Sequence, residues 1–311
     1  MRAGLLRRGG GGPVSEPRIS VVIPTYNQAA YLREALASVL AQTMPDWEAV
    51  VVNNFSDDDT VEAVESLADP RVTLVNFANG GIIAASRNLG LAKARAEWTA
   101  FLDSDDKWRP EKLERCLAAA DNALDVVGHG LVMFKGEREV RTILSGPGNK
   151  ARYRSLLFGG SCMTPSAILI RTEFLKGLGG FSEDRAYITA EDYELWLKMA
   201  GAGARFAFIP DLLTDYRIHE SSASNSIQLH RDSSLRVVED HYRAMAGKRW
   251  ADPIRWRRRI ALIHYGAARK FLAAGDHRAS RASTFKSLSL FPFTARAYAN
   301  LLLCLLPLAR S

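Results

Sequence analysis

Near its start the chain reads Arg18-Ile-Ser-Val-Val-Ile-Pro-Thr-Tyr-Asn27. Residues Ile19–Ile23 are a nearly continuous apolar run, which is typical of a strand covered on both faces of a sheet. Pro24 ends the run, and polar residues follow it. We therefore predict a buried strand whose carboxyl end carries side chains able to contact a ligand.

Strands and helices alternate beyond this segment. Short apolar runs predict strands, and apolar residues at i, i+3 and i+4 spacing predict helices. Further strands are predicted at Trp47–Val52, Val72–Val75 and Trp98–Leu102, and helices at 32–40, after Ser56–Asp59, over Ile82–Ala94 and from Pro110. This order, with its short loops, predicts an α/β fold with a mainly parallel central sheet and helices on both faces.

Three of the predicted strands end in polar clusters. The clusters are Thr25-Tyr26-Asn27, Asn53-Asn54 and Asp103-Ser104-Asp105-Asp106. In a parallel sheet, ligands bind beyond the carboxyl ends of the strands. We therefore expect one binding site to which all three clusters contribute.

The third cluster is rich in carboxylates. Three acidic residues within four positions repel one another unless a cation lies among them, and hard oxygen ligands suit Mg²⁺ or Mn²⁺. The same residues precede Pro110, where Asp and Ser would also serve as caps of the next helix. Both interpretations stay open on these residues alone.

Charge is distributed unevenly along the chain. The net charge is +7, yet residues 229–311 hold 16 Lys or Arg against 5 Asp or Glu, whereas residues 1–228 hold 25 against 29. A mildly acidic body with a basic tail disfavours nucleic acid as a partner and indicates two separate tasks.

The sequence indicates a cytoplasmic protein. Residues 1–17 contain four consecutive glycines but lack the apolar core of a signal peptide, so we predict a disordered leader. The three cysteines have no metal-binding or redox spacing, as expected in a reducing compartment. No run reaches the roughly 18 apolar residues that a membrane-spanning helix needs.

The chain resembles glycosyltransferase family 2, whose members share the GT-A fold. The resemblance rests on five segments in order: Arg18–Asn27, Ala85-Ser-Arg-Asn-Leu-Gly90, Phe101-Leu-Asp-Ser-Asp-Asp106, Ala190-Glu-Asp-Tyr-Glu-Leu-Trp196 and Asp215-Tyr-Arg-Ile-His219. It extends to about Ser222, so we expect a catalytic domain over residues 18–228 and a basic helical tail over 229–311. It implies transfer of a sugar from a nucleotide-diphosphate donor.

The resemblance implies a metal and a donor site. Asp105 would ligate Mg²⁺ or Mn²⁺, assisted by Asp103, which would also lie near the ribose. His219 would bring a basic or metal-binding group to the diphosphate, although a lone histidine is also common as a packed residue. The residues expected around the nucleotide are Pro24, Thr25, Tyr26, Asn54 and Arg87. For Arg87 the alternative is a surface arginine on a helix.

On the acceptor side, the resemblance assigns Asp192 as the general base of an inverting transfer, with Glu191 as its neighbour or an acceptor contact. Adjacent carboxylates share a titration, so the two roles are not separable from sequence. Both residues also precede an apolar helical run, where they would suit a helix N-terminus.

One segment departs from the family pattern. The second strand of these enzymes usually ends in two aspartates, whereas this chain has Asn53-Asn54-Phe55-Ser56. Asparagine keeps an oxygen acceptor but carries no charge. A UDP-sugar is the default donor, and dTDP- or GDP-sugars stay open.

The tail is predicted to be helical over 231–247, 253–274 and Arg278–Leu290, with a last segment from Pro292 through Leu301–Leu308. The cluster Arg255-Trp-Arg-Arg-Arg259 with Trp250 nearby indicates attachment to an anionic membrane surface, on the inner face of the cell membrane. The run Leu301–Leu308 is too short to span the membrane but could bury one face at its interface. The alternative is that these leucines pack on the catalytic domain while the arginines form a solvated face.

We therefore expect an inverting glycosyltransferase acting on a hydroxyl of a saccharide or lipid-linked acceptor. The alternative function is a non-catalytic nucleotide-sugar-binding module that recruits other enzymes of envelope biosynthesis. Metal-dependent turnover of a donor distinguishes the two.

Overall fold

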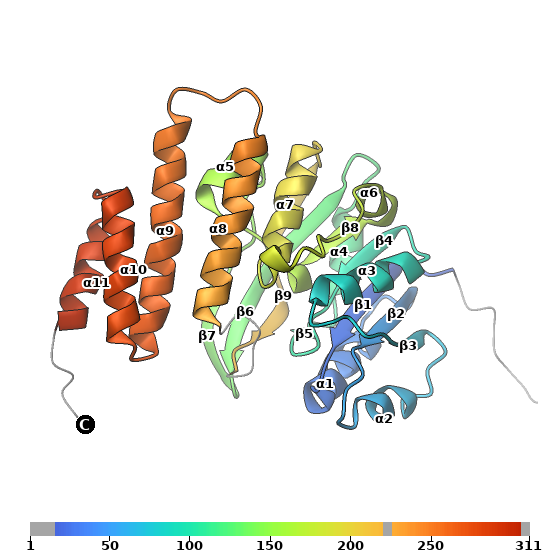
Figure 1. Cartoon of the computed structure of the whole chain (residues 1–311). Helices are drawn as coiled ribbons and strands as arrows, with labels where there is room; N and C mark the ends of the chain where they lie inside the picture. Colours follow the sequence, from blue (N-terminus) through green and yellow to red (C-terminus); the bar gives the residue numbers. More distant parts are fainter. Residues whose placement is uncertain (1–15, 220–225, 306–311) are drawn as a thin grey trace, which may run out of the picture.

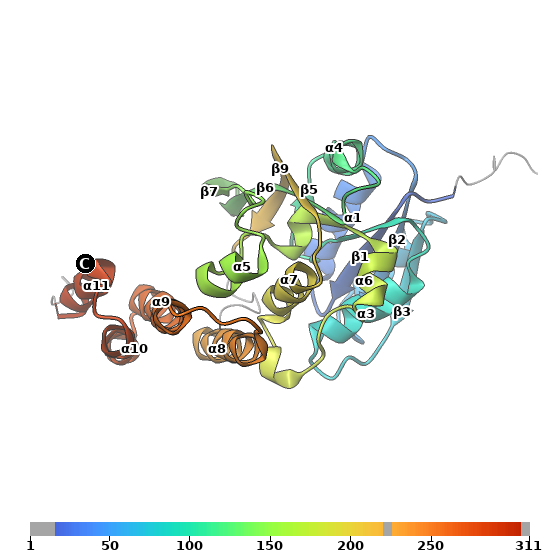
Figure 2. The same ribbon diagram turned by 90° about the horizontal axis from the view of Figure 1, so that it is seen from above.

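The computed structural model of the chain describes residues 16–219 and 226–305 (Figure 1). The predicted leader and the apolar run Leu301–Leu308 extend outside these limits. The described residues form a nine-stranded sheet with helices on both faces, followed by a group of C-terminal helices (Figures 1 and 2). This is the α/β architecture with a helical extension that the sequence predicts.

The first half of the sheet is parallel, as predicted. Strand β1 pairs in parallel with β2 and β4, and β2 pairs in parallel with β3. The register places Thr25 beside Asn53, so the polar ends of β1 and β2 meet at one edge of the sheet. The elements of this half are β1 (Ile19–Thr25), α1 (Ala29–Leu40), β2 (Trp47–Asn53), α2 (Thr60–Glu65), β3 (Val72–Asn76), α3 (Ile83–Lys93) and β4 (Trp98–Phe101).

The sheet becomes mixed in its second half, which the sequence patterns did not predict. Strand β8 is antiparallel to both β4 and β6. Strand β9 runs antiparallel to β5 with Lys107 opposite Asp215, which carries the end of β9 to the loop after β4. The elements are β5 (Lys107–Trp108), α4 (Lys112–Ala119), β6 (Val126–Lys135), β7 (Arg138–Ile143), α5 (Tyr153–Gly159), η1 (Pro165–Ala167), β8 (Ile168–Arg171), α6 (Thr172–Gly177), η2 (Arg185–Tyr187), α7 (Glu191–Gly201) and β9 (Phe206–Arg217).

One helix start differs from the prediction, whereas α2 begins at Thr60, directly after Ser56–Asp59 as predicted. Pro110 does not open α4, because the Lys112 amide donates to the Arg109 carbonyl (3.1 Å) and closes a separate turn before the helix. Before α2, the carboxylate of Asp58 accepts a hydrogen bond from the Ala29 amide (2.8 Å). This contact ties the loop before α2 to the first residue of α1.

Strand β1 is buried along its whole length because apolar clusters cover both faces of the sheet. Ile19, Val21 and Ile23 belong to the cluster that includes the apolar face of α1. Val22 belongs to the opposite cluster, which contains the fully buried Trp196 of α7. The continuous apolar run therefore reflects a strand that packs on both sides.

The C-terminal helices begin inside the main core. Val237 and Val238 of α8 and Ile260 of α9 belong to the same cluster as Trp196. Beyond α9, the remaining helices lie progressively farther from the sheet, with α11 at the outer edge (Figure 2). These helices are α8 (Ile227–Ala244), α9 (Asp252–Ala273), α10 (His277–Leu290) and α11 (Ala295–Leu305).

The predicted cluster Arg255–Arg259 is not a single exposed face. Trp256 stacks on Tyr242 with 5.3 Å between the ring centroids, and Arg259 lies over the ring of Tyr193 at 5.3 Å. Trp256 and Arg259 therefore contact the body of the protein, because successive residues of a helix point in different directions. Within the two described ranges, no helix combines the length and apolar character needed to cross a bilayer.

Candidate active site

A cavity of about 410 Å³ lies at the carboxyl ends of β1, β2 and β4. Side chains from the loops after these strands, from α3 and from the start of α7 line it. The predicted site residues in its wall are Pro24, Thr25, Tyr26, Asn54, Arg87, Asp103, Asp105, Glu191 and Asp192. Of the predicted set, only His219 is outside the lining, and it contacts the cavity through Asp105.

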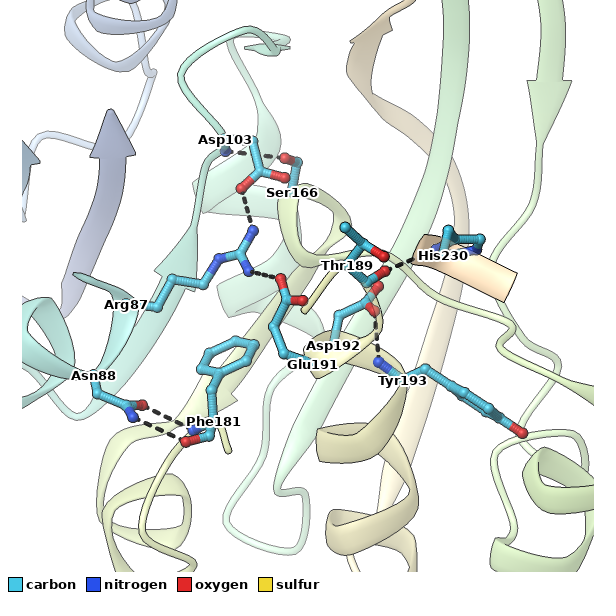
Figure 3. Close-up of polar contacts among 10 residues, drawn as sticks. All are labelled: Arg87, Asn88, Asp103, Ser166, Phe181, Thr189, Glu191, Asp192, Tyr193 and His230. Atoms are coloured by element: carbon cyan, nitrogen blue, oxygen red, sulfur yellow. Dashed lines mark hydrogen bonds and ion pairs between the residues drawn. The ribbon is translucent and has the colours of Figure 1, made fainter. Parts of the chain in front are cut away.

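Arg87 joins the two acidic segments of the cavity (Figure 3). Its Nη2 donates to Oδ1 of Asp103 (2.6 Å), and its Nη1 donates to Oε1 of Glu191 (2.7 Å). Arg87 is only 3% exposed, so it is not a surface arginine. Burial lowers the pKa of Arg87, but the charges of Asp103 and Glu191 outweigh that effect and raise it. The guanidinium therefore stays charged at the centre of the site.

The neighbouring residue Asn88 binds the loop that packs against Arg87. Its side-chain amide donates to the Phe181 carbonyl (2.9 Å) and accepts from the Phe181 amide (2.8 Å) (Figure 3). The ring of Phe181 lies 5.3 Å from the guanidinium carbon of Arg87. Asn88 of α3 thus holds the backbone at Phe181. The ring of Phe181 then lies against the guanidinium of Arg87.

The aspartate cluster concentrates negative charge beside the cavity. Burial and the charge of Asp103 raise the pKa of Asp105, while a hydrogen bond from His219 lowers it. Burial and the charges of Asp105 and Asp103 raise the pKa of Asp106 well above its usual value. Asp106 accepts from the Arg217 amide (3.0 Å) through one oxygen, and its other oxygen has no partner among the described residues.

His219, at the end of the segment Asp215–His219, lies beside Asp105. Its Nε2 is 2.8 Å from Oδ2 of Asp105. The antiparallel pairing of β9 with β5 brings them together across 114 positions of sequence. The carboxylates of Asp103 and Asp105 are hard oxygen donors, the kind that Mg²⁺ or Mn²⁺ prefers. Across residues 16–219 and 226–305, no group of three or more His, Cys, Asp or Glu side chains is arranged to hold a metal ion.

Glu191 and Asp192 occupy the first turn of α7 but differ in environment. Neither caps the helix, since the N-cap residue is Ala190 and no side-chain cap bond forms. Glu191 is paired with Arg87, whereas Asp192 accepts the amide hydrogen of Tyr193 (2.6 Å). Burial and the charge of Glu191 raise the pKa of Asp192 to about 7, and Arg87 opposes them. The pKa of the Asp192 carboxyl group therefore lies near neutral pH.

A contact from α8 holds the turn that precedes these carboxylates. Thr189 has φ of +72°, a conformation that a β-branched residue rarely adopts. Its carbonyl accepts a hydrogen bond from Nδ1 of His230 (2.9 Å) (Figure 3). Burial, with the charge of Lys270, lowers the pKa of His230, so the ring donates as neutral imidazole. The sequence analysis missed His230 because no motif surrounds it.

The two asparagines after β2 have different tasks. Asn53 is buried, accepts from the Ser56 amide (3.0 Å) and hydroxyl (2.6 Å), and donates to Asn76 (2.8 Å). Asn54 lines the cavity, and its side-chain oxygen accepts from the Asn79 amide (2.9 Å). Asn53 thus shapes the loop, and Asn54 alone of the pair faces the cavity.

The chain matches a known family model and a known protein. The family model described as glycosyl transferase family 2 matches residues 20–179. The succinoglycan biosynthesis protein ExoO of Rhizobium meliloti (strain 1021) is 31% identical over 306 residues, which covers 90% of this chain and 83% of that protein.

Two solved structures share the fold. S. aureus TarS 1–349 in complex with UDP-GlcNAc has a TM-score of 0.59 at 20% identity, covering 88% of this chain and 91% of that one. The mannosyltransferase PcManGT of Pyrobaculum calidifontis, in complex with GDP-Man and Mn²⁺, has a TM-score of 0.61 at 22% identity, covering 94% and 87%. The family match and the similarity to ExoO along most of both chains establish that this protein belongs to glycosyltransferase family 2.

Proposed function

We propose that the chain is an inverting, divalent-metal-dependent glycosyltransferase. It would move a sugar from a nucleotide-diphosphate donor to a hydroxyl of a saccharide or lipid-linked acceptor. The observation that carries this proposal is that Asp103 and Asp105 share one cavity with Glu191 and Asp192, with Arg87 bonded to both groups. A donor-side and an acceptor-side set of carboxylates therefore face the same space.

The donor would bind at the ends of β1 and β2. Tyr26 is half-exposed at the cavity, where its ring can contact a nucleobase, and Asn54 presents an amide beside it. The structural relatives TarS and PcManGT, which bind UDP-GlcNAc and GDP-Man respectively, support a nucleotide sugar as donor. We retain a UDP-sugar as the donor to test first. The name of ExoO supports a saccharide acceptor.

Asp105, Asp103 and His219 would hold the Mg²⁺ or Mn²⁺ ion. The Mn²⁺ bound by PcManGT supports a divalent metal ion in this family. When bound, the cation supplies positive charge that offsets the negative charge developing on the diphosphate leaving group. Arg87 contributes a fixed positive charge to the same cavity, and its two ion pairs hold it in place before the donor arrives.

Asp192 would act as the general base. Its carboxylate accepts the proton of the acceptor hydroxyl while the hydroxyl oxygen bonds to the anomeric carbon and the bond to the nucleotide diphosphate breaks. Attack opposite the leaving group inverts the configuration. A pKa of about 7 gives Asp192 a substantial ionised fraction at neutral pH and enough basicity to take the proton. Glu191 is already bonded to Arg87, so it serves as a positioning residue.

The test is release of nucleoside diphosphate from a panel of UDP-, GDP- and dTDP-sugars, with Mn²⁺, with Mg²⁺ and with a chelator. We expect turnover of one class of donor, dependent on the metal and lost in Asp192→Asn. Nucleotide-sugar binding without turnover for every donor and a broad saccharide acceptor panel would instead favour a non-catalytic binding module.

A further inference from the structure

Helices α10 and α11 bury small and polar side chains where they pack near α9, whose own buried residues include Ile260 and Phe271. The buried residues of α10 are Ser280, Ser283, Thr284 and Ser287, and those of α11 are Ala297, Asn300 and Cys304. A helix group in water normally buries its large apolar side chains instead. The buried faces of α10 and α11 are therefore unusually polar for helices that pack together in water.

Hydrogen bonds between the helices hold this interior together. The Ser280 hydroxyl donates to the Ala268 carbonyl (2.8 Å), and the Ser287 hydroxyl donates to the Ala261 carbonyl (2.7 Å). Asn300 of α11 donates to the Thr284 hydroxyl (2.9 Å). Small residues let the helices approach closely, and their hydroxyls then bond across the contact.

The large apolar side chains of α11 point outward. Tyr298, Leu302 and Leu303, which we call the outer face of α11, are all exposed, Leu302 by 65%. Phe293, in the turn before α11, is 83% exposed. Because α11 is the outermost helix of the chain in the view of Figure 2, no other helix of the described chain covers this face. An exposed apolar face of this kind marks a site of association.

The net charge of helices α9, α10 and α11 indicates what binds the outer face of α11. Residues 252–305 contain ten Lys or Arg and two Asp or Glu. Both acidic side chains are engaged, Asp252 with Arg154 and Asp276 with the Ala279 amide (2.8 Å). Arg278, Lys286 and Arg296 are exposed, and none of them forms an ion pair within residues 16–219 and 226–305.

We propose that the outer face of α11 docks on an anionic lipid surface. Tyr298 and Phe293 would lie at the level of the headgroups, Leu302 and Leu303 would enter the acyl boundary, and the exposed basic side chains would contact lipid phosphates. A second copy of the chain is a poorer partner, because pairing two such faces would bring like charges together. The docking surface thus includes part of the leucine run that the sequence indicates, and it differs from the cluster Arg255–Arg259.

The experiment is co-sedimentation of the full chain with vesicles, without donor or acceptor, so that its outcome is independent of the proposed catalysis. One set of vesicles is phosphatidylcholine alone, and the other is an equimolar mixture with phosphatidylglycerol. We expect binding to the mixture only, weakened by high salt. The variant Leu302→Glu/Leu303→Glu should lose binding by roughly tenfold or more, because it removes two apolar anchors and adds like charge.

The matched control is Leu144→Glu, the same change at a side chain that is 62% exposed but lies after β7. It should bind as the parent does, and all variants should keep the parent melting temperature. For the charges, Lys286→Gln/Arg296→Gln should weaken binding, whereas Arg138→Gln/Arg141→Gln on β7 should not. These results would support the proposal.

Three outcomes would overturn it. The parent chain could stay in the supernatant with both vesicle types. Binding could survive the double glutamate variant, or fall equally in the Leu144→Glu control. Light scattering could show a dimer of the parent that the double glutamate variant dissociates, in which case the outer face of α11 binds a second copy instead.

Discussion

Arg87 and Glu191 are 104 positions apart in the sequence, yet Nη1 of the arginine lies 2.7 Å from Oε1 of the glutamate in the interior of the site. The same guanidinium reaches Asp103 at 2.6 Å. One side chain of α3 therefore links the donor-side loop after β4 to the acceptor-side start of α7. The stability of the site and its chemistry are expected to depend on this link.

Arg87→Met should destabilise the protein as well as inactivate it. Removing one partner of a buried ion pair leaves carboxylates that are desolvated and unpaired, which costs about 3–5 kcal/mol. Urea unfolding measures this change. The control is Arg33→Met, which breaks the pair of an exposed arginine with the exposed Glu62 and should change the free energy of unfolding far less. Equal losses in the two variants would contradict a special role for the buried link.

Asp105→Asn should abolish metal-dependent turnover while the fold persists. The variant keeps the size of the side chain but removes a charge that a divalent cation needs. Calorimetric titration with the nucleoside diphosphate, with and without Mn²⁺, should show that the metal no longer improves binding. The exposed Asp57→Asn serves as the control. Parent-like activation by Mn²⁺ in Asp105→Asn would refute the ligand assignment.

Asp192→Asn should lower kcat by about 10²–10⁴ and leave donor affinity nearly unchanged. A base acts on the acceptor in the transition state, so its loss appears in the rate and not in the binding of the nucleotide. Steady-state kinetics with a fixed acceptor, together with donor titration, separate the two. A collapse of donor affinity with kcat preserved would make Asp192 a binding residue.

The pH dependence of kcat should report the ionisation of Asp192. Burial and the charge of Glu191 raise the pKa of Asp192 to about 7, and the base works only when ionised. The rate should therefore be highest above neutrality and fall as the pH decreases through about 7. The residual activity of Asp192→Asn should lack this acid limb. An acid limb that persists in that variant would assign it to another group.

His230→Ala should reduce kcat about tenfold without changing donor affinity, because the turn at Thr189 loses the bond that holds it and Asp192 is displaced. His230→Asn, which keeps an N–H donor, should recover part of the rate. His264→Ala, another partly buried histidine of the tail, is the control. If both alanine variants keep the parent kcat, then His230 has no role in placing the base.

Local sequence patterns predicted the strands of the parallel half of the sheet. Each of the four predicted strands exists, and the central strand β1 is buried along its whole length, whereas the edge strand β3 is only partly buried. Pro110 shows the limit, because its preference for a first helical turn was overridden by a separate turn ending at Lys112. The tail shows another limit, since the helices were predictable but not the direction in which Trp256 and Arg259 point.

The sequence by itself determined the strands and helices of the parallel half of the sheet and the helices of the tail, and that acidic and amide side chains follow the strand ends, because those properties depend on neighbours a few positions apart. Only the tertiary structure decided that Arg87 bonds to both Asp103 and Glu191, that β9 returns His219 to Asp105, and that α8 sends His230 to Thr189. These contacts join residues that are 16 to 114 positions apart. They follow from strand order and helix packing, which bring distant segments together through burial that no local pattern specifies.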